Sequence, residues 1–303
     1  MDADSSTWTI LAGFNRWALY ASMLVGAGSA LFILITPTPE RASRAARTLG
    51  SLAALAAAFF YFAALGLGGA EIMTGGVEIL LAGSTWEMGA STSLGWSAAL
   101  GAPAMLILWH GFTWNQRVLL AVGAAGGILS FLLTGHAATA NPVWLTAPAV
   151  AIHLAGAAYW IGALFPLYRT TRDDDPHTAC ALIIAFSQRA VWMVLAIVVS
   201  GLLISWIQLD EPAALVTTTY GFRLIAKVAL FGMLLALAAY NKLVLTPRIT
   251  SGGQDAATHL RQIIRVEFLL LILIFGVAVS LTLTEPPRAL EPRAPADAVY
   301  SHS

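Results

Sequence analysis

The chain has 303 residues, and its 16 Lys and Arg balance its 16 Asp and Glu, so the formal net charge is zero. Charged residues make up only 11% of the composition and apolar residues 58%, which leaves too little polar surface for a water-soluble globule. These values indicate an integral membrane protein and argue against a nucleic-acid-binding protein. The single cysteine, Cys180, excludes a disulfide scaffold and a cysteine-rich metal cluster.

Long apolar stretches dominate the chain. A helix needs about 20 mostly apolar residues to cross the hydrocarbon core of a bilayer. The stretches are continuous and lack the short alternation of a membrane β-barrel, so we predict an all-α integral membrane protein with eight transmembrane helices. In chain order, the predicted spans are 17–35, 49–69, 93–109, 118–134, 145–167, 182–207, 222–243 and 263–284.

Basic residues gather in alternate connections, and this pattern predicts the orientation. Eleven of the 16 Lys and Arg residues fall after spans 1, 3, 5 and 7, against five on the other side. The richer side should be cytoplasmic. Both termini are therefore expected on the outer side, which in a bacterial inner membrane is the periplasm. That outer side is poor in bases and rich in acids, so it would attract cations.

Three regions are expected along the chain. Residues 1–120 form an N-terminal membrane region with spans 1–3 and a periplasmic loop at 70–92, in which we expect a short helix at Val77–Leu81. Residues 121–285 form a second membrane domain with spans 4–8. Residues 286–303 are proline-rich and are expected to be a disordered periplasmic tail.

Small residues four positions apart predict close helix packing. Gly123 and Gly127 have this spacing in span 4, and Ala158 and Gly162 have it in span 5. We expect spans 4 and 5 to approach neighbouring helices closely at these positions.

His153 is the clearest polar group within a predicted span. Span 5 enters from the outer side near Trp144, so His153 lies about nine residues, or roughly 13 Å, along the helix. The imidazole should be neutral there, because loss of solvent opposes its charged form. A neutral imidazole can bind a metal, bind haem or relay a proton, and it can also simply bond a neighbouring carbonyl. The residue alone leaves these alternatives open.

A second histidine and three methionines make a metal site plausible. His136 stands at the outer end of span 4, and the short connection to span 5 places it in the same half of the membrane as His153. Met73 and Met88 lie in the outer loop, and Met23 lies about two turns into span 1. Thioethers favour Cu(I), and imidazole also suits Cu(II), zinc and iron. Packing is the more frequent role of such methionines.

Three further residues are candidates for lining a path across the membrane. Trp160 lies on the face of His153 two turns further in, where it could gate a path or simply pack. Lys227 lies just inside span 7, and it could extend to the outer interface or pair with an acid. Glu267 lies at the cytoplasmic end of span 8, as an exit carboxylate or an interfacial residue.

The order of several short motifs resembles the copper resistance protein D (CopD) family. That family has a GHA sequence at a helix end, then a helix with a histidine and a W-x-G-G-L-like run; here Ala163 replaces the second glycine of that run. The resemblance extends over about residues 120–285 and covers the first 120 residues only in hydropathy. The motifs that carry it are Thr134-Gly135-His136-Ala137, His153 to Leu164, Phe186-Ser187, Ser200-Gly201, Thr219 to Lys227, Asn241-Lys242, Thr246-Pro247-Arg248 and Arg265-Val266-Glu267.

The resemblance implies a multi-pass inner-membrane protein of copper homeostasis that moves copper ion from the periplasm to the cytoplasm. It also implies a separate periplasmic partner, a copper-binding protein of the copper resistance C type. The chain lacks GxxxxGK[ST], CxxC and HExxH sequences, and we expect no enzymatic activity. Two alternatives remain at this point: a membrane redox protein that carries haem b, and a metal-handling assembly or sensory component that does not conduct.

Overall fold

The computed structural model describes residues 3–135, 140–209, 211–250 and 254–290, and these residues form helices and turns without any strand. The long helices are α1 (Ala3–Ile35), α2 (Glu40–Met73), α4 (Ser93–Thr113), α5 (Arg117–Ser130), α7 (Val143–Asp173), α8 (Pro176–Leu209), α10 (Thr219–Tyr240) and α12 (Gln254–Thr282). The short elements are η1 (Val77–Leu81), α3 (Gly83–Ala90), η2 (Phe131–Leu133), α9 (Ala214–Thr217), η3 (Asn241–Leu245), α11 (Thr246–Thr250) and α13 (Pro287–Leu290).

The all-α prediction is confirmed, and each predicted span lies mainly in one long helix. Six helices of the described chain are long and apolar enough to cross a bilayer. The pair α3 and α4, bent by 90°, brings the number to seven if it forms one span, while the α5–η2 segment, Arg117–Leu133, is shorter. The chain is thus a multi-pass membrane protein by length and composition. The eighth span and the outward position of the termini stay predictions.

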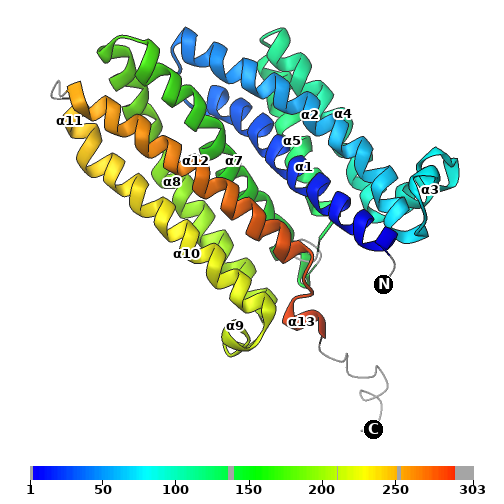
Figure 1. Ribbon diagram of the computed structural model, residues 1–303. Helices are drawn as coiled ribbons and strands as arrows, with labels where there is room; N and C mark the ends of the chain where they lie inside the picture. Colours follow the sequence, from blue (N-terminus) through cyan, green and yellow to red (C-terminus); the bar gives the residue numbers. More distant parts are fainter. Residues whose placement is uncertain (1–2, 136–139, 210, 251–253, 291–303) are drawn as a thin grey trace, which may run out of the picture.

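Helix α7 lies between two groups of helices (Figure 1). On one side it packs against α1, which also contacts α2 and α5, while α4 joins α2 to α5. On the other side α7 packs against α8 and α12, and α12 contacts α10. The predicted small-residue contacts are present: Gly162 of α7 faces Gly28 of α1, and Gly123 of α5 faces the backbone of Leu108. The first helices and the C-terminal helices therefore share one bundle.

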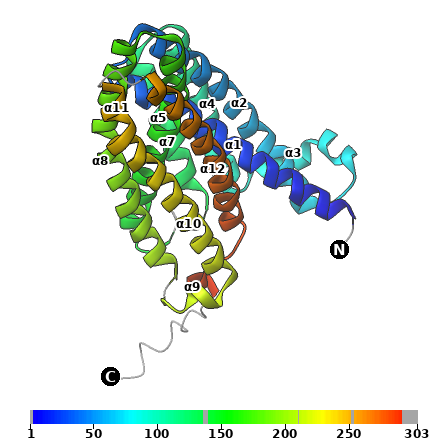
Figure 2. The same cartoon turned by 60° about the vertical axis from the view of Figure 1, so that its left-hand side comes forward.

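The predicted helix at Val77–Leu81 is confirmed as η1, a short 3-10 helix. Sequence analysis did not predict α3, which follows it and lies against the end of α2 where Gly69 faces the backbone of Thr85. Figure 2 shows α3 and the first turns of α1 projecting to one side of the bundle. The tail that we expected to be disordered forms one short helix, α13, at Pro287–Leu290, and its remainder lies outside the described residues.

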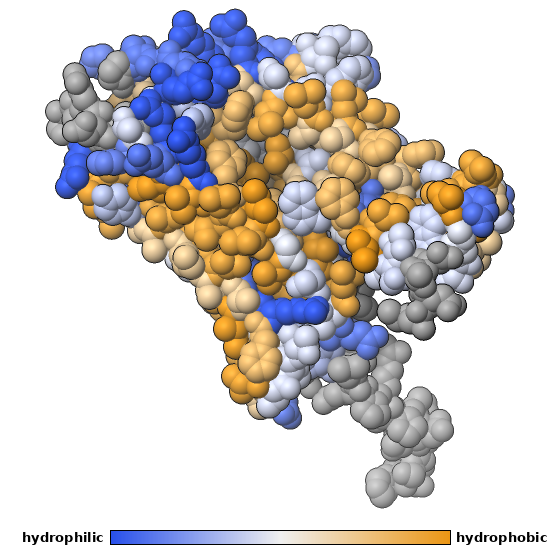
Figure 3. All heavy atoms as spheres, in the orientation of Figure 1, coloured by the Kyte–Doolittle hydropathy of each residue, from blue (hydrophilic) through white to orange (hydrophobic). Residues whose placement is uncertain are grey.

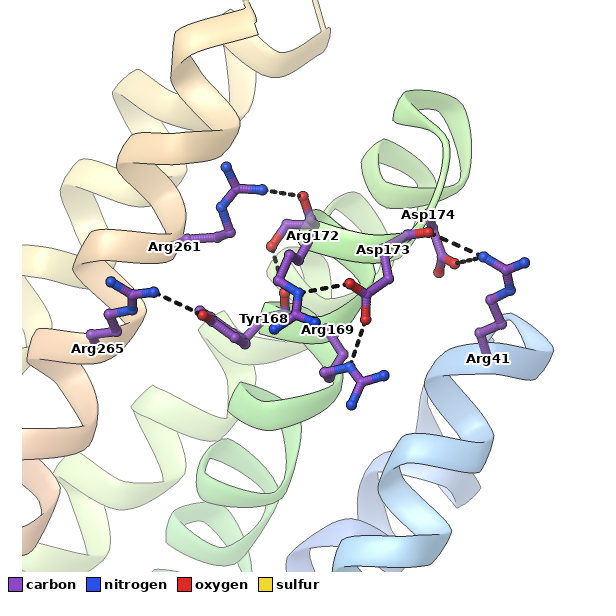
Figure 4. A network of polar contacts seen from close by, with 9 residues as sticks. Arg41, Tyr168, Arg169, Arg172, Asp173, Asp174, Arg261 and Arg265 are labelled. Carbon is purple, nitrogen blue, oxygen red and sulfur yellow. Dashed lines mark hydrogen bonds and ion pairs between the residues drawn. The ribbon is translucent and has the colours of Figure 1, made fainter.

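The predicted basic side is one end of the bundle, away from the N-terminus and α13. Figure 3 shows a hydrophilic cap at that end above a broad apolar belt. Figure 4 shows how arginines of α2 and α12 meet the C-terminal end of α7. Arg41 donates to the Asp174 carboxylate at 3.1 Å, and Arg261 donates to the Thr171 carbonyl at 3.0 Å. Arg265 donates to the Tyr168 hydroxyl at 2.9 Å. These contacts tie the two helix groups together.

Candidate functional site

His153 projects from α7 toward α8, where the two helices come close. Its Nδ1 lies 3.1 Å from the Ile197 carbonyl oxygen and 3.3 Å from Ser200 Oγ. Gly201 makes room for the ring, since a methyl group at this position would lie 3.2 Å from His153 Cε1. The imidazole is half-buried between α7 and α8.

This contact fixes which ring nitrogen carries the hydrogen. A backbone carbonyl only accepts hydrogen bonds, so Nδ1 of His153 donates to Ile197. In the neutral ring, Nε2 then keeps its lone pair, and no hydrogen bond occupies it among the described residues. Metal-binding histidines are held in the same way, with one nitrogen on a carbonyl and the other on the ion. The carbonyl bond that we considered as a structural alternative is present, and it leaves Nε2 available.

The pathway candidates lie at different depths around this ring. Lys227 of α10 interacts electrostatically with His153 and is half-buried, and it forms no ion pair with any described residue. Asp210, one of its proposed partners, lies outside the described residues. Trp160 is buried two turns further along α7, at right angles to the ring of Phe186, and its Nε1 has no hydrogen-bond partner in the described part of the chain.

His136 lies outside the described residues, so the structure does not test the predicted histidine pair. The chain leading to it is described as far as Gly135, whose φ of +85° favours glycine. Among the described residues, no group of three or more His, Cys, Asp or Glu side chains could hold a metal ion. The described residues therefore offer His153 no ready-made cluster of such ligands.

The three candidate methionines are not together. Met73 ends α2 and Met88 lies in α3, and each residue is 39% exposed. Met23 is fully buried in α1 beside Met105 of α4. A methyl group on Gly127 would lie 2.3 Å from Met105 Cε and 3.6 Å from Met23 Cγ. The buried pair lies in the first helix group, and no described contact joins it to His153.

A cavity of about 500 Å³ opens at the end of the bundle opposite the arginine network. It lies among α1, α2, α4, η2 and α12, and Gly135 forms part of its wall. Its polar lining includes Arg16 and Glu71, which carry opposite charges, and the hydroxyls of Tyr20 and Tyr61. The buried Tyr61 hydroxyl bonds to Ser130 Oγ at the bottom of this space. The cavity thus has charged and hydroxyl groups in its wall and lies beside the chain segment that precedes His136.

Glu267 occupies a different environment from the one expected at an interface. Its side chain is 2% exposed in α12, and its Oε1 accepts a hydrogen bond from Asn241 Nδ2 at 2.8 Å. Asn241 begins η3, one turn of π-helix at the end of α10. The carboxyl group thus lies inside the bundle.

The family comparison covers the part of the chain that contains His153's partners and Glu267. Residues 180–281 match the family model described as Copper resistance protein D. A curated Copper resistance protein D from Pseudomonas syringae pv. tomato is 29% identical over 298 residues, which cover 89% of this chain and 95% of that protein. Both comparisons support a relationship of this chain to the copper resistance protein D (CopD) family. No solved structure matches it.

Sequence analysis missed two CopD-domain residues that the structure brings to the candidate groups. Ser200 approaches His153, and Asn241 binds Glu267. Both are polar residues within predicted apolar spans, which was the available signal, and both belong to the motifs of the resemblance. The Ile197 carbonyl carries no signal in the sequence, because every helical residue has a backbone carbonyl. Only the packing of α7 on α8 brings this one to the His153 side chain.

Proposed function

We propose that this protein is an inner-membrane copper-handling protein that binds a copper ion in the periplasmic half of the membrane and moves it into the cytoplasm without enzymatic chemistry. The observation that carries the proposal is the orientation of His153. Its Nδ1 is held by the carbonyl of Ile197, a residue of the region that matches the CopD model, and this leaves Nε2 as a ligand between α7 and α8.

Copper is the cation that the relationship to the CopD family favours, and the ligand chemistry agrees with it. Imidazole binds both Cu(I) and Cu(II), and thioethers select Cu(I). In this proposal His153 and His136 bind the ion, and Met73 or Met88 of the outer loop captures it at the entrance. The thioether of Met23, buried beside Met105 in the first helix group, would contact the copper ion after its capture in the outer loop.

Passage needs no nucleotide in this scheme. An inside-negative membrane potential favours inward movement of a cation by about 2.3 kcal/mol per charge for each 100 mV. Trp160, buried two turns below His153, would separate the binding site from the cytoplasmic end. A separate periplasmic copper-binding protein of the copper resistance C type would deliver the ion to the polar cavity at the outer end.

The test is metal analysis of the purified full-length protein in lipid nanodiscs, loaded with Cu(I) and desalted. His153→Gln should weaken copper binding by about tenfold or more, because it removes the imidazole lone pair while keeping a polar group of similar size. His153→Gln should also abolish copper accumulation by vesicles that contain the protein.

His110→Gln is the matched control. His110 also bonds a helix carbonyl through Nδ1, to Leu106 at 3.0 Å, but it lies near the end of α4 that faces the arginine network. This variant should keep its copper. Copper content unchanged by His153→Gln would contradict the assigned site, and a Soret absorption band in the purified protein would favour the haem alternative instead.

A further inference from the structure

Glu267 is an acidic side chain in a place that holds few polar groups. It lies in α12 with 2% of its surface exposed, and its partner Asn241 comes from the end of α10. An ionised carboxylate in an apolar interior requires a cation or several hydrogen-bond donors. What surrounds Glu267 therefore decides whether it can carry a charge.

The neighbouring charged groups are engaged elsewhere. Lys242, next to Asn241, directs Nζ to the Ser187 carbonyl at 3.4 Å, and Arg265 of α12 binds the Tyr168 hydroxyl of α7. Arg189 of α8 donates to the Ile35 carbonyl at the end of α1.

Of the described residues, the other elements packed on α12 bring no further charged group to Glu267. Arg248 of α11 has an interaction of its own, and the described basic residue of α1, Arg16, lines the cavity at the opposite end. Burial and the Asn241 amide are the influences on Glu267 within the described chain, and no charged group contributes.

The hydrogen bonds between Glu267 and Asn241 leave one acceptor of the amide without a donor among the described residues. Asn241 Nδ2 donates to Glu267 Oε1, but the buried Asn241 Oδ1 receives no hydrogen bond from any described residue. An ionised carboxylate cannot supply one, whereas a protonated carboxyl group has an O–H that can. A carboxylic acid and a primary amide are complementary, since each offers one donor and one acceptor. A single added proton would therefore neutralise the acid and provide the donor that the amide lacks.

The backbone at Asn241 is also irregular. The helix changes from α to one turn of π-helix at Asn241–Leu245, and Thr246 Oγ1 donates to the Asn241 carbonyl at 2.9 Å. Single π-turns within helices occur frequently at functional sites. The Asn241 amide is thus presented by a segment in which the regular hydrogen-bond pattern is already broken.

We propose that Glu267 and Asn241 form a proton-binding site inside the membrane, and that this site exchanges its proton as a cation crosses the protein. The first half of the proposal depends only on the pair itself. The second half rests on the proposed copper movement, for which release of the proton would compensate the charge of the arriving ion.

Dicyclohexylcarbodiimide tests the proton site directly, because this apolar reagent adds a protonated carboxyl group to its C=N bond and leaves a stable acylurea. In nanodiscs near neutral pH, mass spectrometry should find the label on Glu267. The rate of labelling should fall about tenfold for each pH unit once the carboxyl group ionises. Asn241→Leu should change this pH profile, since it removes the amide that pairs with the acid.

Glu40 is the internal control, because its side chain is 70% exposed and pairs with Arg44 and Arg47. A water-soluble carbodiimide with an added amine should modify Glu40 and spare Glu267. Glu267→Gln should fold normally, as its amide supplies the missing donor, and should abolish labelling. Absence of label on Glu267, or equal modification by the water-soluble reagent, would overturn the proton site.

The coupling is measured in vesicles that contain a trapped pH dye. Copper addition should drive a proton flux with the native protein and not with Glu267→Gln, although the variant binds copper as before. Copper uptake without proton flux would overturn the coupling while leaving the proposed function intact. Failure of the native protein to bind or take up copper would instead defeat the proposed function, and with it the coupling, while the labelling result still decides the proton site.

Discussion

At the level of single residues, Gly28 shows why α1 and α7 can approach so closely. A methyl group on Gly28 would lie 1.9 Å from the Ala158 carbonyl oxygen, and a methyl group on Gly162 would lie 2.0 Å from the Gly28 carbonyl carbon. Each clash is with backbone, which cannot turn aside as a flexible side chain can. The small-residue spacing that sequence analysis noted at Ala158 and Gly162 is therefore one half of a reciprocal contact.

Gly28→Ala should destabilise the protein by about 1–3 kcal/mol, because α1 and α7 must separate to admit the methyl group. Thermal unfolding of the detergent-solubilised protein measures the effect. Gly232→Ala in α10 is the matched control, since nothing lies within 4 Å of its added methyl group. Alanine is the better helix former by about 1 kcal/mol, so this control should be neutral or stabilising. Equal loss of stability in both variants would argue against the close contact.

At the level of elements, arginine side chains complete the C-terminal ends of helices. Arg117 donates to the Leu34 carbonyl at 3.0 Å and Arg189 to the Ile35 carbonyl at 2.7 Å, so two arginines cap α1. The last carbonyls of a helix have no internal donor, and positive charge is favourable there. The basic residues from which sequence analysis predicted a cytoplasmic side thus also hold helix ends together.

The N-terminal end of α8 is capped by an acid. Asp175 Oδ2 accepts from the Thr178 hydroxyl at 2.6 Å, and Oδ1 accepts from the amides of His177 and Thr178, each at 3.0 Å. The Thr178 hydroxyl and then its amide lower the pKa of Asp175, because they bind the ionised form. The cap therefore stabilises α8 at neutral pH. Its contribution begins to fall at about pH 4, where Asp175 of the unfolded chain binds a proton, and it is lost once the pH drops through the lowered pKa of the folded protein.

Asp175→Ala should accelerate hydrogen exchange at the amides of His177 and Thr178 at pH 7, since both lose their acceptor. The difference from the native protein should shrink once the pH is low enough to protonate Asp175 in the folded state. Asp175→Asn keeps an acceptor oxygen and does not titrate, so it should remain protected over the same range. A difference that persists unchanged at low pH would mean that the carboxylate is not the cap.

At the scale of the whole molecule, the apolar stretches determine the helices, but only packing determines their partners. Sequence analysis located all eight long helices because continuous apolar runs have few alternatives in a bilayer. It began α1 at residue 17, whereas the helix starts at Ala3 and continues through Asn15 and Arg16, two polar residues that interrupt the apolar run. It identified His153 but not the Ile197 carbonyl. It considered Glu267 as an exit carboxylate or an interfacial residue, and the structure buries this side chain against Asn241.

The orientation of the bundle is the last property that the basic residues predict. The connections after spans 1, 3, 5 and 7 hold eleven of the 16 Lys and Arg residues, and the arginine network gathers many of them at one end. Positive charge resists transfer across an inside-negative membrane, so that end should be cytoplasmic. The chain has a single cysteine, so replacing Cys180 with serine gives a background for placing one thiol at a time.

In intact spheroplasts, a membrane-impermeant maleimide should label Ser84→Cys, in the exposed first turn of α3. It should label Gln116→Cys, exposed before α5 beside the contact of Arg47 with Asn115, only after the membrane is permeabilised. Labelling of both in detergent shows that each thiol is reactive. The reverse pattern would place the cavity at the cytoplasmic end, and copper entering through it would then leave the cell.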